Sequence, residues 1–179
     1  MRLLAGLCFK NVKGRESQMT EKNNELLFRR AVPPEKSALQ KLQIDVFSGE
    51  QGIPPEEVPV LPSLAPQYWC AVKDSVPIGA VAAWREEGKV HWGRFAVKKE
   101  YRGQHIGQEL ALYSLRDLFS QQVDTIYLGA RDATVKLMEK WGGKAIGASS
   151  FFHGSAITPV ILQRDDFWRA QEQGEIRRG

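Results

Sequence analysis

The sequence has little of what defines several classes of protein. It contains only two cysteines among 179 residues, Cys8 and Cys70. Two cysteines cannot build a framework of disulfide bridges, and no Cys or His residues have the spacing of a zinc site. We therefore predict no metal and a reducing compartment, the cytoplasm. The longest apolar stretches, such as Ala80–Trp84, are far shorter than the roughly 18 residues of a transmembrane helix, so no membrane partner is expected.

A strong excess of one charge is also missing. The formal net charge is +4, and residues 1–19 contain four basic side chains against one acidic side chain. The rest of the chain is therefore close to neutral. Proteins that bind nucleic acids hold the phosphates with many clustered Lys and Arg side chains. The composition thus argues against a nucleic acid as partner.

The composition is that of one globular domain, with 42% hydrophobic and 26% charged residues. We expect residues 1–19 to be an N-terminal extension, either a short targeting segment or the consequence of an upstream start codon, with Met19 favoured as the functional start. Residues 20–168 would form the domain. Residues 169–179 are expected to be a polar, frayed tail.

Apolar periodicity and turn residues predict alternating strands and helices. A helix of about four turns should follow Pro33 and end at Gly49–Gly52, and others should cover 106–119 and 134–141. The proline-rich segment 53–66 is expected to be a surface loop. Strands are predicted at 26–32, 68–73, 78–85, 89–97, 124–130, 144–152 and 156–163. This order predicts an α/β (α+β) domain with a mixed, mostly antiparallel sheet flanked by helices.

The most informative segment is 97–107, which joins a predicted strand to the most amphipathic helix and contains Gly103 and Gly107. The first N–H groups of a helix lack partners and lie at the positive end of the helix dipole, so they can bind a diphosphate. The spacing is neither a Walker loop nor a dinucleotide fingerprint. Taken alone, the glycines fit an anion-binding turn or a plain strand-to-helix turn.

Three blocks of the sequence resemble the GNAT superfamily of acyl-CoA N-acyltransferases. Phe95–Val97 followed by Tyr101–Gly107 resembles the acyl-CoA pyrophosphate motif Arg/Gln-x-x-Gly-x-Gly/Ala. Residues 132–143 resemble a second block of the superfamily. Residues 46–54 resemble the Val-Phe-x-x-Glu-Gln-Gly-Ile/Val-Pro signature of one bacterial branch. The resemblance covers roughly residues 26–167 and implies a GNAT-like fold with acetyl-CoA, or another acyl-CoA, as co-substrate.

The resemblance also implies where the cofactor binds. Backbone amides of the glycine loop would surround the CoA diphosphate, and the preceding strand would line the pantetheine arm. That strand would separate from the strand around 126–130, with the thioester in the gap. The implied cofactor-binding residues are Phe95, Ala96, Val97, Arg102, Gly103, Gln104, His105, Ile106 and Gly107.

The chain departs from the superfamily pattern at two positions. His105 stands where the motif usually has glycine, which would restrict the loop or place an imidazole near phosphate. Met138 stands where the second block usually has the tyrosine that protonates the leaving thiolate. The resemblance therefore leaves the general acid unassigned.

Direct acyl transfer to an amine needs a base and an acid but no covalent intermediate. Cys70 is thus interpreted as a buried, small apolar residue. His91 is the first candidate base, because imidazole suits proton abstraction near neutral pH; the alternative is a half-exposed strand histidine. Glu50, with Glu56 and Glu57 beyond it, is expected in the loop after the first helix, to bind or deprotonate the amine or simply to face solvent.

Candidates for the missing acid are Tyr127, Tyr113 and His153, of which Tyr127 lies on the later of the two separating strands. Water is the remaining proton source. The tryptophans at positions 84, 92 and 141 are expected to fill the core or the pocket walls.

The resemblance and these residues predict an N-acetyltransferase that acts on a small-molecule amine. Two alternatives stay open: a non-catalytic acyl-CoA-binding or regulatory module, favoured by the two departures, and a long-chain N-acyltransferase. The acceptor is not identified by the sequence, and a homodimer also stays open.

Overall fold

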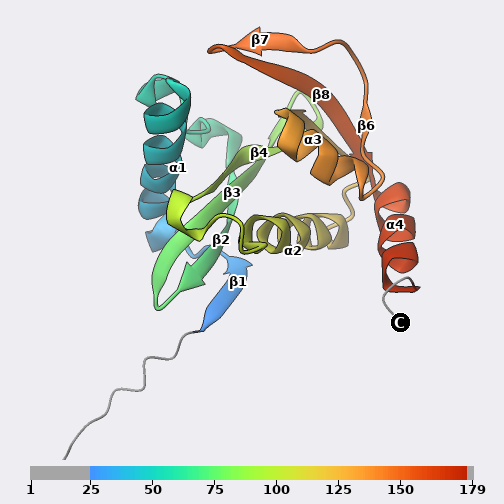
Figure 1. Cartoon of the computed structure of the whole chain (residues 1–179), viewed down its shortest axis with the longest axis horizontal. Helices are drawn as coiled ribbons and strands as arrows, with labels where there is room; N and C mark the ends of the chain where they lie inside the picture. The colour runs from blue at the N-terminus through green and yellow to red at the C-terminus, as the bar shows by residue number, and fades with distance from the viewer. Residues whose placement is uncertain (1–24, 177–179) are drawn as a thin grey trace, which may run out of the picture.

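The computed structural model describes residues 25–176, which form an eight-stranded sheet with helices on both faces (Figure 1). The strand order is β1-β2-β3-β4-β5-β8-β6, with β7 beside β8. Among the described strands only β4 and β5 pair in parallel, which confirms the predicted mixed, mostly antiparallel sheet. The strands are β1 Leu26–Arg30, β2 Gln67–Lys73, β3 Val76–Glu86, β4 Lys89–Val97, β5 Thr125–Ala130, β6 Lys144–Ala145, β7 Ser150–Phe152 and β8 Ser155–Gln163.

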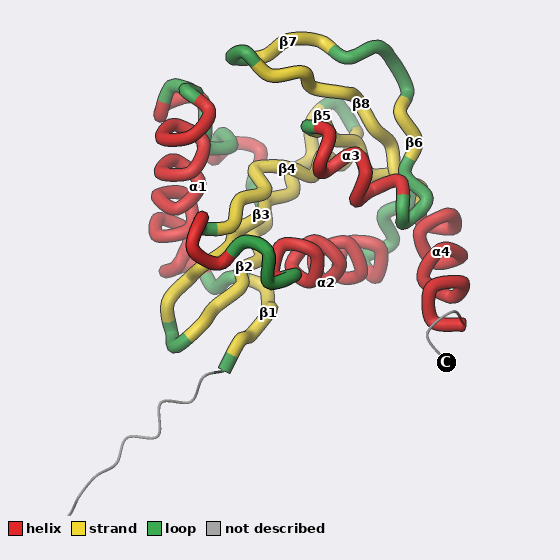
Figure 2. Tube along the Cα trace, in the orientation of Figure 1, coloured by secondary structure: helices red, strands yellow, loops and turns green. Residues whose placement is uncertain are grey.

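The described chain has four α-helices (Figure 2): α1 Lys36–Gln51, α2 Ile106–Ser120 and α3 Asp132–Glu139 pack against the sheet, and α4 Arg164–Ile176 follows the end of β8. Side chains alternate between the two faces of β2, because successive residues of a strand point in opposite directions. Cys70 belongs to the buried cluster under α1. Trp69 and Ala71 belong to the larger cluster under α2. None of the described helices is both long and apolar enough to cross a membrane.

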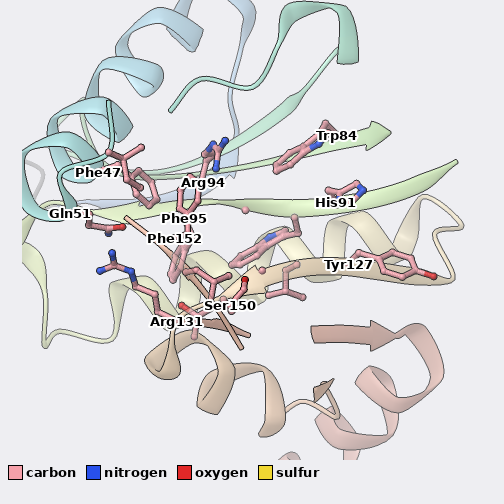
Figure 3. Close-up of a pocket in the computed structure, with 18 residues that line it drawn as sticks. Phe47, Gln51, Trp84, His91, Arg94, Phe95, Tyr127, Arg131, Ser150 and Phe152 are labelled. Carbon is pink, nitrogen blue, oxygen red and sulfur yellow. The ribbon is translucent and has the colours of Figure 1, made fainter. Parts of the chain in front are cut away.

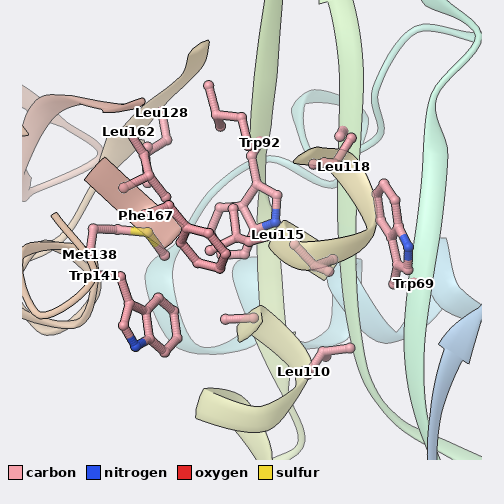
Figure 4. Close-up of a cluster of buried hydrophobic side chains, with 14 of the residues drawn as sticks. Trp69, Trp92, Leu110, Leu115, Leu118, Leu128, Met138, Trp141, Leu162 and Phe167 are labelled. Atoms are coloured by element: carbon pink, nitrogen blue, oxygen red, sulfur yellow. The ribbon is translucent and has the colours of Figure 1, made fainter. Parts of the chain in front are cut away.

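The larger cluster fixes α2 against the centre of the sheet (Figure 4). The indole nitrogen of buried Trp92 on β4 donates to Ser114 Oγ on α2 at 2.9 Å, and that of Trp69 donates to Asp117 at 2.7 Å. These bonds satisfy polar atoms that would otherwise be buried unpaired. Trp92 and Trp141 lie in the core as predicted, and Trp84 is half-buried at a cavity wall.

The first helix ends at the second of the two glycines that were predicted to end it. Gly49 does not end it; α1 continues to Gln51 and ends at Gly52, whose φ of +64° is the left-handed conformation that glycine adopts without strain. Segment 53–66 has no strand or α-helix, and its prolines begin two short 3₁₀ turns, Pro55–Glu57 and Pro62–Leu64. The extension places Glu50 on a helix rather than in a loop, which changes its role below.

The C-terminal part differs most from the prediction. The expected strand 144–152 is two short strands, β6 and β7, which both pair with β8. The prediction of a frayed tail from residue 169 was wrong for the residues up to Ile176, because these residues continue helix α4. Phe167 anchors α4: it is fully buried and packs on Phe119 with ring centroids 5.0 Å apart. The predicted extension 1–19 lies outside the described residues.

Candidate active site

The strands β4 and β5 separate soon after they meet. They pair only at Val90 with Ile126 and at His91 with Tyr127. Within the described residues, β4 stays paired with β3 only beyond this point. The pairing register shifts between Ala80 and Ala82 of β3, because β4 contains a bulge there. Arg94 in this bulge has a φ of +52°. A bulge bends its strand and re-aims side chains, so it contributes to the separation that the resemblance implies.

Two cavities lie along the separated strands. The strand cavity, of about 420 Å³, lies between β4 and β5 and is closed by residues of β7 and β8 (Figure 3). The helix cavity, of about 560 Å³, lies at the N-terminus of α2. The two share four lining residues, Gln51, Phe95, Arg131 and Thr134. They therefore meet at a junction, and a molecule in one can contact a molecule in the other.

The helix cavity presents unpaired backbone N–H groups. The N–H of Glu109 donates to the carbonyl oxygen of His105 at 3.0 Å, and no N–H from Gly103 to Gln108 donates to a backbone carbonyl within the described chain. The N-cap residue His105 supplies no side-chain cap either. Such N–H groups at the positive end of a helix form an anion site. All the predicted cofactor residues line this cavity except Gln104, whose side chain donates to the Glu100 carbonyl.

The backbone conformation of His105 explains why the motif usually has glycine at this position. His105 has a φ of +60° and Gly103 a φ of +76°, both in the left-handed region. A residue with a Cβ adopts this conformation at a cost of about 1–2 kcal/mol. The loop thus keeps the shape of the motif despite its histidine.

Gly107 lets α2 approach β4 closely. A Cβ added to Gly107 would lie 3.2 Å from Phe95 Cζ and 3.5 Å from Val97 Cγ2. A side chain at position 107 would therefore press on Phe95, which would have to move by a few tenths of an ångström to accommodate even a methyl group. The close approach brings the open helix N-terminus to the strand that would line the pantetheine arm.

Arg102 joins the loop to two other elements. Its guanidinium donates to both carboxylate oxygens of Glu50 at 2.7 and 2.8 Å, and its Nε donates to the carbonyl oxygen of Val97 at 2.9 Å. Hydrogen bonds from Arg102 hold the pKa of the Glu50 carboxyl below its usual range. Glu50 lies on α1 at the helix cavity and does not line the strand cavity. Its predicted place in a loop was therefore wrong, because Glu50 belongs to helix α1.

A Glu50→Gln variant is expected to weaken acetyl-CoA binding a few-fold with little change in turnover. Exposed ion pairs contribute about 1 kcal/mol or less, and the pair fixes only the loop. Because the folded-state pKa of Glu50 is lowered, the pair is complete above the usual carboxyl pKa and is lost as the pH falls through the lowered value. Calorimetric titrations with acetyl-CoA should show equal affinities for the variant and the native protein only at a pH below the lowered pKa of Glu50, where the native carboxyl is also uncharged. A large loss of turnover in the variant would restore a catalytic role for Glu50.

His91 and Tyr127 lie at one end of the strand cavity, and Gln51 and Arg131 lie at the other (Figure 3). The His91 ring stacks on Trp84 with centroids 5.6 Å apart and lies 6.2 Å from the Tyr127 ring. The residues that line this cavity include no Asp or Glu. An imidazole is therefore the only side chain around the cavity of a type that accepts a proton near neutral pH.

The other proposed acids and bases lie elsewhere. Tyr113 is 40% exposed on α2 and lines neither cavity. His153 lies in the turn between β7 and β8, with Nε2 3.1 Å from a carboxylate oxygen of Glu57. Met138 is fully buried in the larger core cluster. None of these three side chains reaches the junction of the cavities.

Cys70 is also excluded as a nucleophile by its surroundings. It is fully buried in β2, and burial raises the pKa of its thiol to about 11. Its Sγ lies 3.7 Å from the Arg29 carbonyl oxygen, to which it donates. The interpretation as a buried structural residue is confirmed.

Sequence reasoning missed several residues at the cavities. Arg94, Arg131 and Thr134 line the strand cavity, and fully buried Gln43 donates to the carbonyl oxygen of Arg94 at 2.6 Å. Arg131 follows a predicted strand and precedes a predicted helix, a position that often carries functional side chains. No pattern in the sequence marks the bulge at Arg94.

A Gln43→Met variant is expected to lower the free energy of unfolding by about 1–3 kcal/mol, because it leaves the buried carbonyl of Arg94 without a donor. Urea unfolding followed by circular dichroism measures this loss. The matched control is Gln40→Met on the same helix, whose amide donates to the hydroxyl of Tyr68 at 3.2 Å in a less buried place. An equal loss in both variants would contradict a special role for the bulge contact.

A mixed sheet that separates between β4 and β5, with an open helix N-terminus beside the gap, defines the fold of acyl-CoA N-acyltransferases. The model of the acetyltransferase (GNAT) family matches residues 37–143. The chain belongs to this family. No group of three or more His, Cys, Asp or Glu residues in the described range could hold a metal ion.

Comparison with solved structures supports the fold. An acyl-CoA N-acyltransferase from Pseudomonas aeruginosa is 21% identical, with a TM-score of 0.65 over 76% of this chain and 97% of that chain. ElaA of Escherichia coli is 18% identical, with a TM-score of 0.66 over 76% and 99%. FeeM, an N-acyl amino acid synthase from uncultured soil microbes, is 14% identical, with a TM-score of 0.66 over 82% and 94%. No curated protein matches the sequence significantly.

Proposed function

We propose that this protein is an N-acetyltransferase that transfers an acetyl group, or another acyl group, from acyl-CoA to a small-molecule amine in the cytoplasm. One observation carries the proposal. The open N-terminus of α2 lines one cavity, the separated strands line another, and the two meet at Phe95 and Thr134. Donor and acceptor can thus contact each other while each occupies its own site.

The donor would occupy the helix cavity. The unpaired N–H groups of Gly103–Gln108 would donate to the CoA diphosphate, where the helix dipole adds a favourable interaction. The separated edge of β4 at Phe95–Val97 offers strand N–H and C=O groups to the amide-containing pantetheine arm. The thioester would then lie at the junction of the cavities.

The reaction would proceed by direct attack. The amine nitrogen bonds to the thioester carbon, the carbon–sulfur bond breaks, and the CoA thiolate leaves. The bulge at Arg94 leaves a residue outside the strand ladder, so a backbone N–H there can polarise the thioester carbonyl. His91 would accept the amine proton through water, since it lies at the far end of the strand cavity from Arg131.

The leaving thiolate would take its proton from water. Met138 is buried in the core and offers no hydroxyl, and Tyr127 lies at the end of the cavity that is remote from the junction (Figure 3). Thiols are much more acidic than alcohols, and that of cysteine titrates near pH 8.5, so a thiolate can leave without full protonation in the transition state. The Thr134 hydroxyl at the junction could hold the water molecule that supplies this proton.

Release of free CoA thiol tests the proposal. The protein is incubated with acetyl-CoA and a panel of small amines, and the thiol is detected with a chromogenic disulfide. Amine-dependent thiol release with formation of the acetylated amine is expected. If acetyl-CoA binds but no amine releases thiol, the non-catalytic acyl-CoA-binding alternative holds. A strong preference for long-chain over acetyl donors would support a long-chain N-acyltransferase.

A further inference from the structure

The strand cavity is cationic although most of its wall is apolar. Arg94 and Arg131 both line it, and no Asp or Glu does. The Nε atoms of both arginines are enclosed and have no hydrogen-bond partner. Buried polar atoms are nearly always paired in folded proteins. In the described part of the chain the only hydrogen bond of either guanidinium group is the one from Arg94 to the Glu57 carbonyl oxygen, so both groups have Nη donors that a bound anion can use.

Arg94 is held firmly in this place. Its backbone is fixed by the bulge and by the Gln43 amide, which donates to its carbonyl oxygen at 2.6 Å. One Nη donates to the carbonyl oxygen of Glu57 at 3.1 Å, but no carboxylate pairs with the guanidinium in the described chain. Burial lowers the pKa of Arg94, although the nearby Tyr68 and Glu57 act in the opposite direction. A cation that is fixed in place without a hydrogen-bonded carboxylate can bind an anion with little rearrangement.

Arg131 reaches the same end of the cavity from the opposite strand. It follows β5 directly and precedes the first residue of α3. Figure 3 shows both arginines toward the end of the cavity that holds Phe47 and Phe152, and away from His91. Within residues 25–176 no hydrogen bond or ion pair involves the Arg131 side chain.

We propose that the acceptor is an amine that also carries a carboxylate, which Arg94 and Arg131 bind, with an apolar body against the aromatic wall. This inference rests on the proposed function and names its substrate class. The planar guanidinium group matches the two oxygens of a carboxylate. Phe47, Trp84 and Phe152 line the rest of the cavity, and such rings favour an apolar side chain over a polar one. An amino acid with a large apolar side chain has this chemistry.

The same charges disfavour other acceptors. A polyamine or a lysine-rich peptide would bring further positive charge beside two arginines, with no acid on the cavity wall to balance it. A cavity of about 420 Å³ lies within the range of small-molecule sites, about 300–1,000 Å³. The strand cavity therefore favours a compact zwitterion.

Matched pairs of amines test the proposal. Phenylalanine is compared with phenethylamine, and tryptophan with tryptamine, in the thiol-release assay with acetyl-CoA; spermidine is included as a polycation. The kcat/KM for each amino acid should exceed that of its decarboxylated partner by about 100-fold or more, since a buried polar site strongly rejects analogues that leave it unpaired. Equal or better use of the decarboxylated amines or of spermidine would overturn the inference while supporting the proposed function. If no amine at all releases thiol, the proposed function itself fails.

Binding measurements test the role of the two arginines independently of the acyl-transfer reaction. The amide product N-acetylphenylalanine should bind the native protein and should bind Arg94→Met and Arg131→Met at least about tenfold more weakly. The affinity for acetyl-CoA should change by less than about twofold in Arg94→Met, because Arg94 lines the strand cavity and not the helix cavity. The matched control is Arg85→Met on the exposed part of β3, which should leave both affinities unchanged. Unaltered product binding in both cavity variants, with folded spectra, would contradict the assignment.

Discussion

A Gly107→Glu variant is expected to remain folded and to lose all detectable binding of acetyl-CoA. Position 107 lies in the first turn of α2, beside the unpaired N–H groups that would hold the diphosphate. A carboxylate there would repel the diphosphate at short range. Its Cβ would also meet Phe95 Cζ at 3.2 Å and press on the wall of the pantetheine site. Isothermal titration calorimetry with acetyl-CoA measures the loss.

Two further variants distinguish the effect of the negative charge at position 107 from the effect of the size of the side chain. Ser120→Glu adds the same charge at the exposed C-terminal end of α2 and should bind acetyl-CoA normally. Gly107→Ala adds only a methyl group, which the Phe95 side chain can accommodate by a shift of a few tenths of an ångström, so an intermediate affinity is expected. A folded Gly107→Glu protein that retained native affinity would exclude the α2 N-terminus as the diphosphate site.

A His91→Ala variant is expected to lose about 10²–10⁴-fold in kcat, the usual contribution of a positioned general base. The affinity for acetyl-CoA should stay nearly constant, because His91 lines the strand cavity and not the helix cavity. The thiol-release assay at saturating acetyl-CoA gives kcat, and calorimetry gives the dissociation constant. This pattern is the opposite of the one expected for Glu50→Gln.

Chemical rescue distinguishes a base from a packing residue. The His91 ring stacks on Trp84, so its removal leaves space for free imidazole, which should restore part of the rate at millimolar concentration. A Tyr127→Phe variant keeps the neighbouring ring but removes its hydroxyl, and it should retain most of the activity if water protonates the thiolate. An unchanged rate in His91→Ala would contradict the base role.

Local patterns predicted most of the fold. The hairpin turn at residues 86–88 and the apolar residues that follow it predicted β4 with its observed bounds, Lys89–Val97. The apolar positions of α2 are the ones that contact the core. The glycine loop was predicted because its requirement, an open helix N-terminus after a strand, is local in the sequence.

The features that failed or were missed depend on contacts distant in the sequence. Glu50 was expected in a loop, but it lies on helix α1 and its carboxylate is bound by Arg102, a partner 52 residues away. The bulge at Arg94 lies where β4 stays paired with β3 and separates from β5. The Gln43 side chain on α1 fixes it by donating to the Arg94 carbonyl oxygen. The helix at the C-terminus was missed because its composition is polar, although the buried residue Phe167 anchors it.

A thermal-shift titration with acetyl-CoA tests the acyl-CoA site most directly. At about 100 times the dissociation constant, a ligand stabilises the folded state by roughly 2.7 kcal/mol, which for a chain of this size raises the melting temperature by about 5–10 °C. We expect this rise with acetyl-CoA and its absence in Gly107→Glu. No rise with acetyl-CoA, free CoA or a long-chain acyl-CoA would show that the cavity at the start of α2 does not bind this cofactor.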